Sequence, residues 1–190
     1  MNNERQSWNE RWSDKDFSDG WQADSWLLQH HRLLSGSSAL DVACGRGRNA
    51  LFLAEQGFNV TALDYSSVAL RQLADKAAER GVAMTTLETD LENSPQLPQQ
   101  QFDLVINFFY LYRPLLLGLR ERVKPGGLIM IRTFTSAGDG EPCRLEPKMV
   151  LEPGELLQIF ADWEILVHEE GLEPSKKGGT LVGLLARKPA

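Results

Sequence analysis

The chain has 190 residues, with 20 basic and 26 acidic side chains and a formal net charge of −6 at pH 7. This length suits one well-buried α/β domain and is short for two. No basic run exceeds two residues and the net charge is negative, which disfavours nucleic-acid and anionic-membrane partners. Only two cysteines occur, and the N-terminus is polar with no apolar segment after it, so we expect a cytoplasmic protein.

Apolar periodicity and breaker residues predict alternating helices and strands along the chain. The expected helices cover residues 25–34, 49–56, 114–123 and 155–160, and a longer helix capped by Ser66 or Ser67 continues to about Arg80. The first expected strand begins the run 39–49, and the others cover 60–63, 84–88, 102–107, 128–134, 164–170 and 180–186. This alternation predicts a Rossmann-like α/β fold, with a seven-stranded mostly parallel sheet, helices on both faces and a C-terminal antiparallel hairpin. We expect a single domain over residues 1–190, with an N-terminal lid segment at 1–24 and an irregular insertion at 136–150.

The most informative stretch runs from Ala39 to Asn49, where an apolar strand carrying Asp41 passes through a glycine-containing turn into a helix. An unpaired carboxylate in a buried strand is costly, so Asp41 needs a cationic or hydrogen-bonding partner. Gly45 and Gly47 allow a sharp turn and the close approach of a ligand. The next strand ends in Asp64. Two neighbouring strands that present acids around such a turn predict a nucleoside-binding crevice.

The glycine turn by itself fits two kinds of nucleoside site. A dinucleotide fingerprint has a third glycine, and the looser form of it accepts the Ala50 found here. A pyrophosphate at the helix N-terminus, however, gains nothing from the nearby anion Asp41, whereas a ligand with an ammonium or sulfonium cation does. The expected C-terminal hairpin also differs from the further βα unit of a dehydrogenase. Both features disfavour a nicotinamide oxidoreductase.

Short motifs with the residues and spacings of a known protein family occur over roughly the whole chain. They are Asp41-x-Ala-Cys-Gly-x-Gly-Arg-Asn49, Asp64, Asp90-Leu91, Lys124-Pro125-Gly126-Gly127, Pro153-Gly154-Glu155-Leu156-Leu157 and Trp163. In these motifs the chain resembles the class I S-adenosylmethionine-dependent methyltransferases, in the form found in the tellurite-resistance (TehB-like) group. The resemblance implies S-adenosyl-L-methionine as the cofactor and a methyl transfer as the reaction.

The resemblance also implies which residues contact the cofactor. They are Arg11, Asp41, Ala43, Gly45, Gly47, Arg48, Asn49, Asp64, Tyr65, Asp90, Leu91 and Asn107. Asp41 would lie near the methionine ammonium, Asp64 would accept both ribose hydroxyls, and Asp90 with Leu91 would receive the adenine amine. Each acid also has a plainer interpretation, as a helix cap at Asp64 or a turn residue at Asp90. Arg48 and Asn49 either bind the cofactor carboxylate or cap their helix.

Aromatic residues concentrate in two segments that are expected to surround the methyl acceptor. Trp8 and Trp12 lie one helical turn apart in the N-terminal segment, which either covers a sheet edge or closes as a lid that brings Arg11 to the cofactor carboxylate. The sequence 107–110, Asn-Phe-Phe-Tyr, lacks the two prolines of the motif found there in amino-methyltransferases of nucleic acids, and we interpret it as an apolar wall. The expected acceptor-contacting residues are Trp12, Tyr110 and Arg113, although Arg113 is equally compatible with a solvated surface position.

We therefore expect a methyltransferase acting on a small molecule, with a thiol or a chalcogen oxyanion as the acceptor class. The tellurite-resistance group uses a His-Arg pair before the last strand, and neither residue type occurs in residues 172–177 of this chain. The three histidines have no convincing metal-ligand spacing, and no residue is assigned a catalytic role. The alternative is a non-catalytic S-adenosylmethionine-binding sensor or accessory protein. The sequence does not indicate an oligomeric state.

Overall fold

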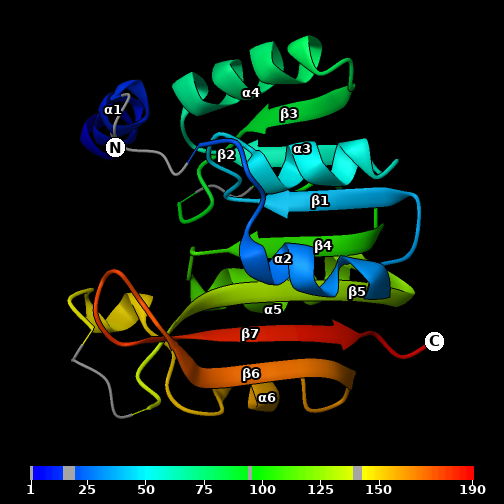
Figure 1. Ribbon diagram of the computed structural model, residues 1–190, viewed down its shortest axis with the longest axis vertical. Helices are drawn as coiled ribbons and strands as arrows, with labels where there is room; N and C mark the ends of the chain where they lie inside the picture. Colours follow the sequence, from blue (N-terminus) through cyan, green and yellow to red (C-terminus); the bar gives the residue numbers. More distant parts are fainter. Residues whose placement is uncertain (1, 15–19, 94–95, 139–142) are drawn as a thin grey trace. The chain divides into compact units, whose positions relative to one another are not determined.

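The structure is a computed structural model that describes residues 2–14, 20–93, 96–138 and 143–190. The chain divides into two compact units, Met1–Gln99 and Gln100–Ala190, which we call the first and the second unit. Each unit contains strands flanked by helices, in the alternating order that the sequence predicts (Figure 1).

The first unit contains three parallel strands, β1, β2 and β3, with β2 between the other two. Its elements are α1 (Asn2–Ser13), α2 (Ser25–His30), the 3₁₀ helix η1 (His31–Leu33), β1 (Ser38–Val42), α3 (Arg48–Glu55), β2 (Asn59–Asp64), α4 (Ser67–Glu79) and β3 (Met84–Glu88). Helix α3 packs against β1 and β2, and α4 packs against β2 and β3. The predicted helix at 25–34 is divided, because the α-helix ends at His30 and a single 3₁₀ turn follows.

Local sequence signals explain the helix starts of this unit. The Ser66 hydroxyl caps α4 by accepting a hydrogen bond from the Ala69 amide at 3.2 Å. Asp24 caps α2 in the same way, by accepting from the Trp26 amide at 3.0 Å. Helix α3 instead begins after Gly47, which has a φ of 71°, a left-handed conformation that glycine adopts without strain.

The second unit contains four strands in the order β4-β5-β7-β6, where β4 and β5 are parallel and both pairings of β7 are antiparallel. Its elements are β4 (Phe102–Phe108), α5 (Arg113–Arg122), β5 (Val123–Thr135), the 3₁₀ helix η2 (Pro147–Met149), α6 (Glu155–Ile159), β6 (Glu164–Pro174) and β7 (Thr180–Arg187). The predicted seven strands, mostly parallel with an antiparallel C-terminal hairpin, are thus confirmed.

Two strands of the second unit, β5 and β6, are longer than predicted by several residues, whereas β4 and β7 each extend by one. Strand β5 begins at Val123, five residues early, because Val123 already pairs with Phe102 and an irregularity in β4 before Leu104 accommodates the Pro-Gly-Gly sequence. Strand β6 continues to Pro174 through a register shift after Glu170, where Gly171 has a φ of 75°. Glycine residues that interrupt a strand pattern are compatible with such bulges.

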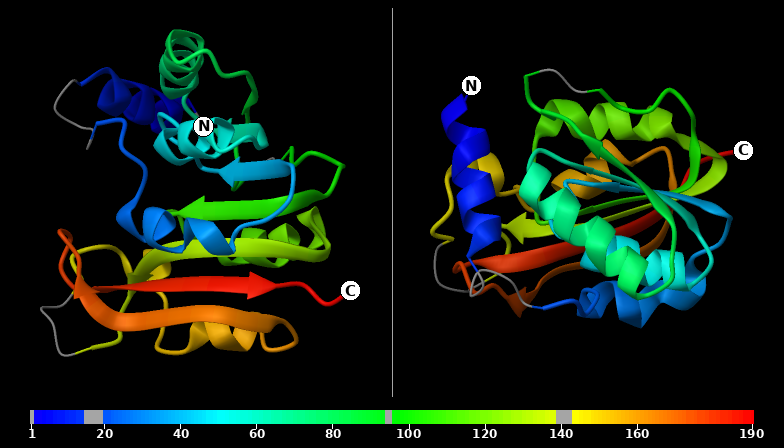
Figure 2. Two further views of the ribbon diagram at one scale, coloured as in Figure 1. Left: turned by 45° about the vertical axis from the view of Figure 1, so that its right-hand side comes forward. Right: turned by 90° about the horizontal axis from the view of Figure 1, so that it is seen from above.

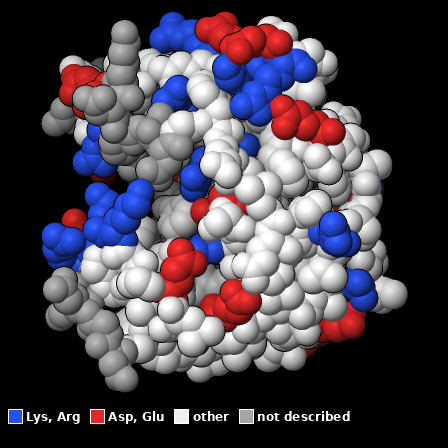
Figure 3. Space-filling model, in the orientation of Figure 1, with Lys and Arg blue, Asp and Glu red and all other residues white. Residues whose placement is uncertain are grey.

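Within the part of the chain that is described, no helix has the length and apolar character needed to cross a membrane. Charged side chains of both signs lie next to each other on the face shown in Figure 3, as they do around α4. There Lys76 pairs with Glu79, and Arg80 pairs with Glu55. Neighbouring charges of opposite sign reduce the local electrostatic potential of this part of the surface.

Candidate functional site

The turn between β1 and α3 has an unusual backbone, with left-handed φ angles at Ala43 (56°), Gly45 (56°) and Gly47 (71°). Ala43 is one of two described non-glycine residues with a positive φ, a conformation that is costly for a residue with a β-carbon. The turn is fixed by hydrogen bonds from the Cys44 amide to the Leu63 carbonyl (2.8 Å) and from the Gly47 amide to the Cys44 carbonyl (2.9 Å). The sequence predicted this turn from the two glycines, but not the strain at Ala43.

Asp64 lies at the carboxyl end of β2, directly beside the turn. Its Oδ2 accepts a hydrogen bond from the Gly45 amide at 2.7 Å, and its Oδ1 accepts from the Ser66 amide at 2.8 Å. Burial raises the pKa of Asp64 above its usual value, and these backbone donors oppose that rise. The Tyr65 amide is a further backbone donor to Asp64. A carboxylate has about four acceptor positions, so Asp64 keeps acceptor capacity for a ligand.

Asp41 lies in β1, opposite Ala62 of β2, with 2% of its surface exposed. Burial, and to a lesser extent the nearby Asp64 carboxylate, raises the pKa of Asp41 from 3.8 to about 8. Among the described residues, none donates a hydrogen bond to its Oδ2. A buried carboxyl group with an unused acceptor is matched to a cationic ligand group, which would favour the ionised form.

Arg48 and Asn49 begin α3, and both bind Asp24 in the segment before α2. An Arg48 Nη2 donates to the Asp24 carboxylate at 3.2 Å, and the Asn49 Oδ1 accepts from the Asp24 amide at 2.9 Å. Asp24 and Asn49 are buried. These two predicted cofactor residues therefore tie residues 20–24 to the glycine turn. Sequence reasoning missed Asp24, although an acid directly before the first residue of an apolar helical pattern is a helix-cap signal.

Helix α1 packs alongside α4 and reaches the glycine turn (Figure 2). The Trp12 indole covers Gly45 so closely that a β-carbon built on Gly45 would lie 2.6 Å from the indole Cζ2. Two polar contacts hold the helix there: Gln72 Nε2 donates to the Trp12 carbonyl at 2.9 Å, and the Ser66 hydroxyl donates to Asn9 Oδ1 at 2.7 Å. The structure thus places the predicted acceptor residue Trp12 on the predicted cofactor turn.

Two arginines of α1 lie against aromatic rings. The Arg5 guanidinium forms an ion pair with Glu88 at the end of β3 and lies 5.3 Å from the centre of the Tyr65 ring. Arg11, the predicted partner of the cofactor carboxylate, is exposed and lies 4.9 Å from the centre of the Trp8 ring. The rest of the predicted lid includes residues 1 and 15–19, which lie outside the described residues.

Asp90 and Leu91 follow β3. The Asp90 Oδ1 accepts from the amides of Glu92 (3.1 Å) and Asn93 (3.0 Å), so Asp90 stabilises the turn that it begins. Leu91 is buried, with 5% of its surface exposed. Among the described residues, the Asn93 side-chain amide donates to Asp90 Oδ2 at 3.1 Å, which leaves acceptor capacity on that oxygen. The turn and a ligand-binding role are therefore compatible at this residue.

In the second unit, Asn107 is buried within β4, and the aromatic residues 108–110 follow it. Phe109 has a φ of 58°, and its amide donates to the Arg132 carbonyl of β5 at 2.7 Å. Its ring contacts Phe134, with ring centres 5.7 Å apart. Tyr110 lies next in the chain and is half-buried. The predicted apolar wall thus has a strained backbone held by a strand hydrogen bond.

Arg113, the predicted acceptor residue, uses all three of its side-chain nitrogens within the second unit. Its Nε and one Nη donate to the Glu155 carboxylate at 2.6 and 2.9 Å. The same guanidinium donates to the carbonyls of Lys148 and Val150 at 3.0 and 2.9 Å. Arg113 therefore anchors the end of the 136–150 insertion. Among the described residues, no group of acids, histidines and cysteines could hold a metal ion.

Comparisons with known proteins agree with this geometry. Residues 39–127 match the family described as "Methyltransferase domain". The chain is 32% identical over 170 residues to the ubiquinone biosynthesis O-methyltransferase of Rickettsia akari (strain Hartford), covering 77% of this chain and 67% of that protein. It is 26% identical over 148 residues to the probable S-adenosyl-L-methionine-dependent methyltransferase TehB of Haemophilus influenzae (strain ATCC 51907 / DSM 11121 / KW20 / Rd), covering 74% of this chain and 51% of that protein.

The fold is also found among solved structures. The crystal structure of TehB from Haemophilus influenzae superposes with a TM-score of 0.76 at 22% identity, covering 95% of this chain and 67% of that chain. The chain spans about half the length of several curated relatives that it matches. By its sequence and by its fold, the chain belongs to the S-adenosylmethionine-dependent methyltransferases.

Proposed function

We propose that this protein transfers the methyl group of S-adenosylmethionine to a small molecule. The observation that carries the proposal is the Asp41 carboxyl group, which is buried, has an unused acceptor and has a pKa raised to about 8. A structural acid in this position would cost stability unless a cation arrived to pair with it. The cofactor of this family has such a cation in its methionine ammonium, so the residues present fit it.

Different residues beside the glycine turn would bind different groups of the cofactor. Asp41 would pair with the ammonium, while Asp64 would accept from the ribose hydroxyls with the acceptor capacity that its backbone donors leave unused. The strained Ala43 and the glycines would let the ligand approach the backbone of the turn. When bound, S-adenosylmethionine supplies a methyl group already activated on a sulfonium. The protein then mainly has to align a nucleophile and exclude water.

Helix α1 is the part of the first unit that would exclude water. Trp12 already covers Gly45, and Arg5 reaches Tyr65 at the end of β2. We propose that α1 moves outward to admit the cofactor and then closes over it, as a lid.

For the acceptor we propose a soft nucleophile, a thiol or a reduced chalcogen. A thiolate is already nucleophilic near neutral pH and needs no strong base. In this proposal the buried acids beside the glycine turn, Asp41 and Asp64, bind the cofactor, and a soft nucleophile reacts without help from either. Similarity to a TehB protein points in the same direction. The free cysteines Cys44 and Cys143 support a cytoplasmic location for such an enzyme.

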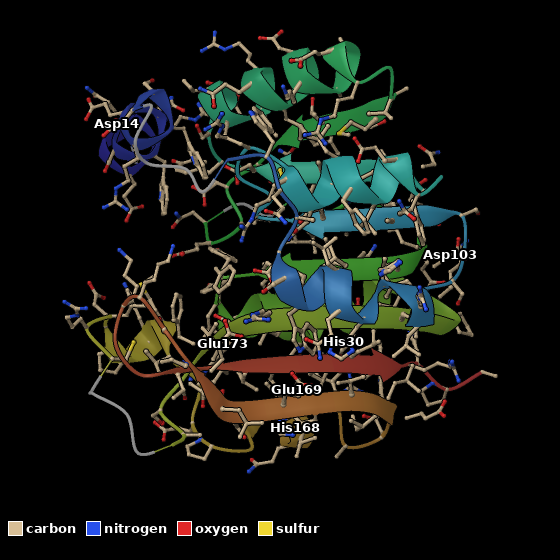
Figure 4. The ribbon with its side chains drawn as sticks, viewed as in Figure 1. Asp14, His30, Asp103, His168, Glu169 and Glu173 are labelled. Carbon is tan, nitrogen blue, oxygen red and sulfur yellow. The ribbon has the colours of Figure 1, made fainter. Side chains whose placement is uncertain are left out.

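A methyl-transfer screen tests the proposal. The purified protein would be incubated with methyl-labelled S-adenosylmethionine and a panel of thiols, selenite, tellurite, small amines and phenols. We expect labelled product from a thiol or a chalcogen compound, and loss of that product in the Asp41→Asn variant. Asp103→Asn is the matched control, because Asp103 lies at the opposite end of β4 from the aromatic wall and pairs with Lys124 at 2.8 Å (Figure 4).

The screen also separates the alternatives. Product from amines or phenols alone would contradict the soft-nucleophile class while leaving the methyltransferase activity. Tight cofactor binding without product from any acceptor would favour a non-catalytic S-adenosylmethionine-binding sensor or accessory protein.

A further inference from the structure

Strand β5 has a mostly apolar sequence, but it contains one buried cationic side chain, Arg132. Arg132 has 3% of its surface exposed. It pairs with Phe108, the last residue of β4, so it lies level with the carboxyl end of that strand. Ligands of parallel α/β sheets bind outside the carboxyl ends of the strands. Arg132 is therefore a charged group at the ligand-binding end of the second unit.

One partner of Arg132 is much more exposed to solvent than Arg132 itself. Arg132 forms an ion pair with Glu173, whose side chain is 56% exposed, whereas the side chain of Arg132 is 4% exposed. Removing a guanidinium from water is costly, and a buried cation that loses its partner destabilises the fold. Glu173 can swing into water with little change in its own hydration, but Arg132 cannot follow it. A second anion could therefore replace Glu173 at Arg132.

Arg132 reaches across β7 to β6. Its partner on β7 is Gly183, which has no side chain, and Gly183 in turn pairs with Glu169 of β6. Paired residues on antiparallel strands point to the same face, so Arg132, Gly183 and Glu169 form one row on that face. Figure 4 shows His168, Glu169 and Glu173 following one another along β6 toward the hairpin connection. Because no side chain of β7 intervenes in this row, the Arg132 guanidinium can extend to acids of β6, as its ion pair with Glu173 shows.

An apolar wall adjoins the same residue. The Phe109 amide binds the Arg132 carbonyl at 2.7 Å, and Phe109 contacts Phe134, which points to the same face of β5 as Arg132. A cation beside aromatic rings suits an acceptor with an anionic group and an apolar or soft part.

The insertion holds the hairpin that carries Glu173. The Arg144 amide donates to the Lys177 carbonyl at 2.8 Å, and the Thr180 hydroxyl donates to the Ala137 carbonyl. In Figure 1 the segment around η2 and the β6–β7 connection accordingly lie at the same end of the second unit. Arg113 fixes the other end of the insertion through Lys148 and Val150. The position of Glu173 is thus set by the insertion rather than by the sheet alone.

We propose that Arg132 binds an anionic group of the methyl acceptor and that Glu173 occupies this position until the acceptor displaces it. The inference rests on the proposed methyl transfer and adds the substrate class, a thiol or chalcogen compound that also bears a carboxylate or a similar oxyanion. With a thiolate acceptor, a new sulfur–carbon bond forms to the methyl group as the bond from the sulfonium sulfur breaks. The bonding electrons remain on that sulfur, and the thiol proton goes to solvent.

The test uses two thiols that differ in charge, 3-mercaptopropionate and its neutral isostere 3-mercaptopropionamide. We expect a lower KM for the carboxylate in the unmodified protein. Glu173→Gln removes the competing anion and should lower that KM several-fold, whereas Arg132→Lys loses the two-pronged contact and should raise it about tenfold. In both variants the KM of the amide should change less than the KM of the carboxylate, and the two variants should move the carboxylate KM in opposite directions. Glu164→Gln is the matched control, because Glu164 forms an exposed ion pair with Arg187 at the far end of β6.

Opposite effects of the two variants distinguish acceptor binding from a structural ion pair. A purely structural pair predicts that both variants lower thermal stability and affect both thiols equally, and this result would overturn the inference. Glu173 is exposed, so its variant is expected to fold even where an Arg132 variant does not.

A binding measurement separates this inference from the proposed function. Calorimetric titration of 3-mercaptopropionate into protein saturated with S-adenosylhomocysteine requires no turnover. Binding that is tighter in Glu173→Gln, without methylated product, would support the anion site and contradict the methyl transfer. Turnover of both thiols with equal KM would support the methyl transfer and contradict the anion site.

Discussion

The Trp12 indole lies on the Gly45 turn, at the place where a side chain on residue 45 would begin. This contact joins helix α1 to the glycine turn within the first unit. The N-terminal helix and the turn therefore have to be considered together, because any ligand that approaches Gly45 must displace Trp12.

We expect Gly45→Val to abolish S-adenosylmethionine binding, because the added β-carbon would displace Trp12 and occupy space that the ligand needs. The left-handed φ of 56° adds backbone strain. Gly81→Val is the matched control, since Gly81 has a similar φ of 67° with open space around it. Calorimetry of both variants separates the clash from the strain. Normal binding by Gly45→Val would mean that the turn faces away from the cofactor.

Helix α1 should exchange its amide hydrogens more slowly when the cofactor product is bound. Its 12 residues carry few buried side chains of their own, and an isolated helix of this length is marginal in water. We expect stronger protection of residues 5–13 with S-adenosylhomocysteine, measured by hydrogen exchange and mass spectrometry. Equal and strong protection in both states would make α1 a permanently packed structural helix.

Asp64→Ala should weaken S-adenosylmethionine binding by about 2–3 kcal/mol, the scale for losing charge-assisted hydrogen bonds in a partly buried site. The variant also frees the Gly45 and Ser66 amides, so its thermal stability must be measured beside its affinity. Asp75→Ala, on the exposed side of α4, should leave both quantities unchanged. Unchanged affinity in a folded Asp64→Ala protein would reduce Asp64 to a structural acid.

Arg113→Ala should lower the free energy of unfolding by about 1–2 kcal/mol, because a half-exposed ion pair and two hydrogen bonds to carbonyls are lost. The hydrogen bond from Arg113 holds the pKa of Glu155 below its usual 4.5. This contribution is present above pH 4.5 and is lost as the pH falls through the lower, folded-state value. Denaturant unfolding at pH 7 and pH 3 checks it, with Glu146→Ala as the surface control. No difference at pH 7 would contradict an anchoring role.

The glycine turn, the acids beside it and most strand bounds follow from local sequence patterns, since glycine spacing and apolar alternation act over a few residues. Contacts between distant residues do not. Arg113 meets Glu155 from 42 positions away, and Arg132 meets Glu173 from 41. Both arginines resemble surface or strand residues until their partners are placed. Trp12 on Gly45 is missed for the same reason, because packing between an N-terminal helix and a later turn leaves no periodic signal.

The most direct test of the account is the number of protons released when S-adenosylmethionine binds. Burial keeps Asp41 largely protonated at pH 7, with its pKa at about 8, and pairing with the cofactor ammonium favours the ionised form. The pKa of Asp41 is higher in the folded protein than the unfolded value of 3.8, so the stability of the unliganded fold decreases as the pH rises toward 8. The affinity for the cofactor should increase over the same range, because the ionised carboxylate pairs with the ammonium. Calorimetry at pH 7 in two buffers of different ionisation enthalpy measures the proton count. We predict release of close to one proton by the unmodified protein and none by Asp41→Asn, which should also bind more weakly. Equal enthalpies in both buffers, with unchanged affinity in Asp41→Asn, would contradict the assignment of this buried carboxylate to the cofactor.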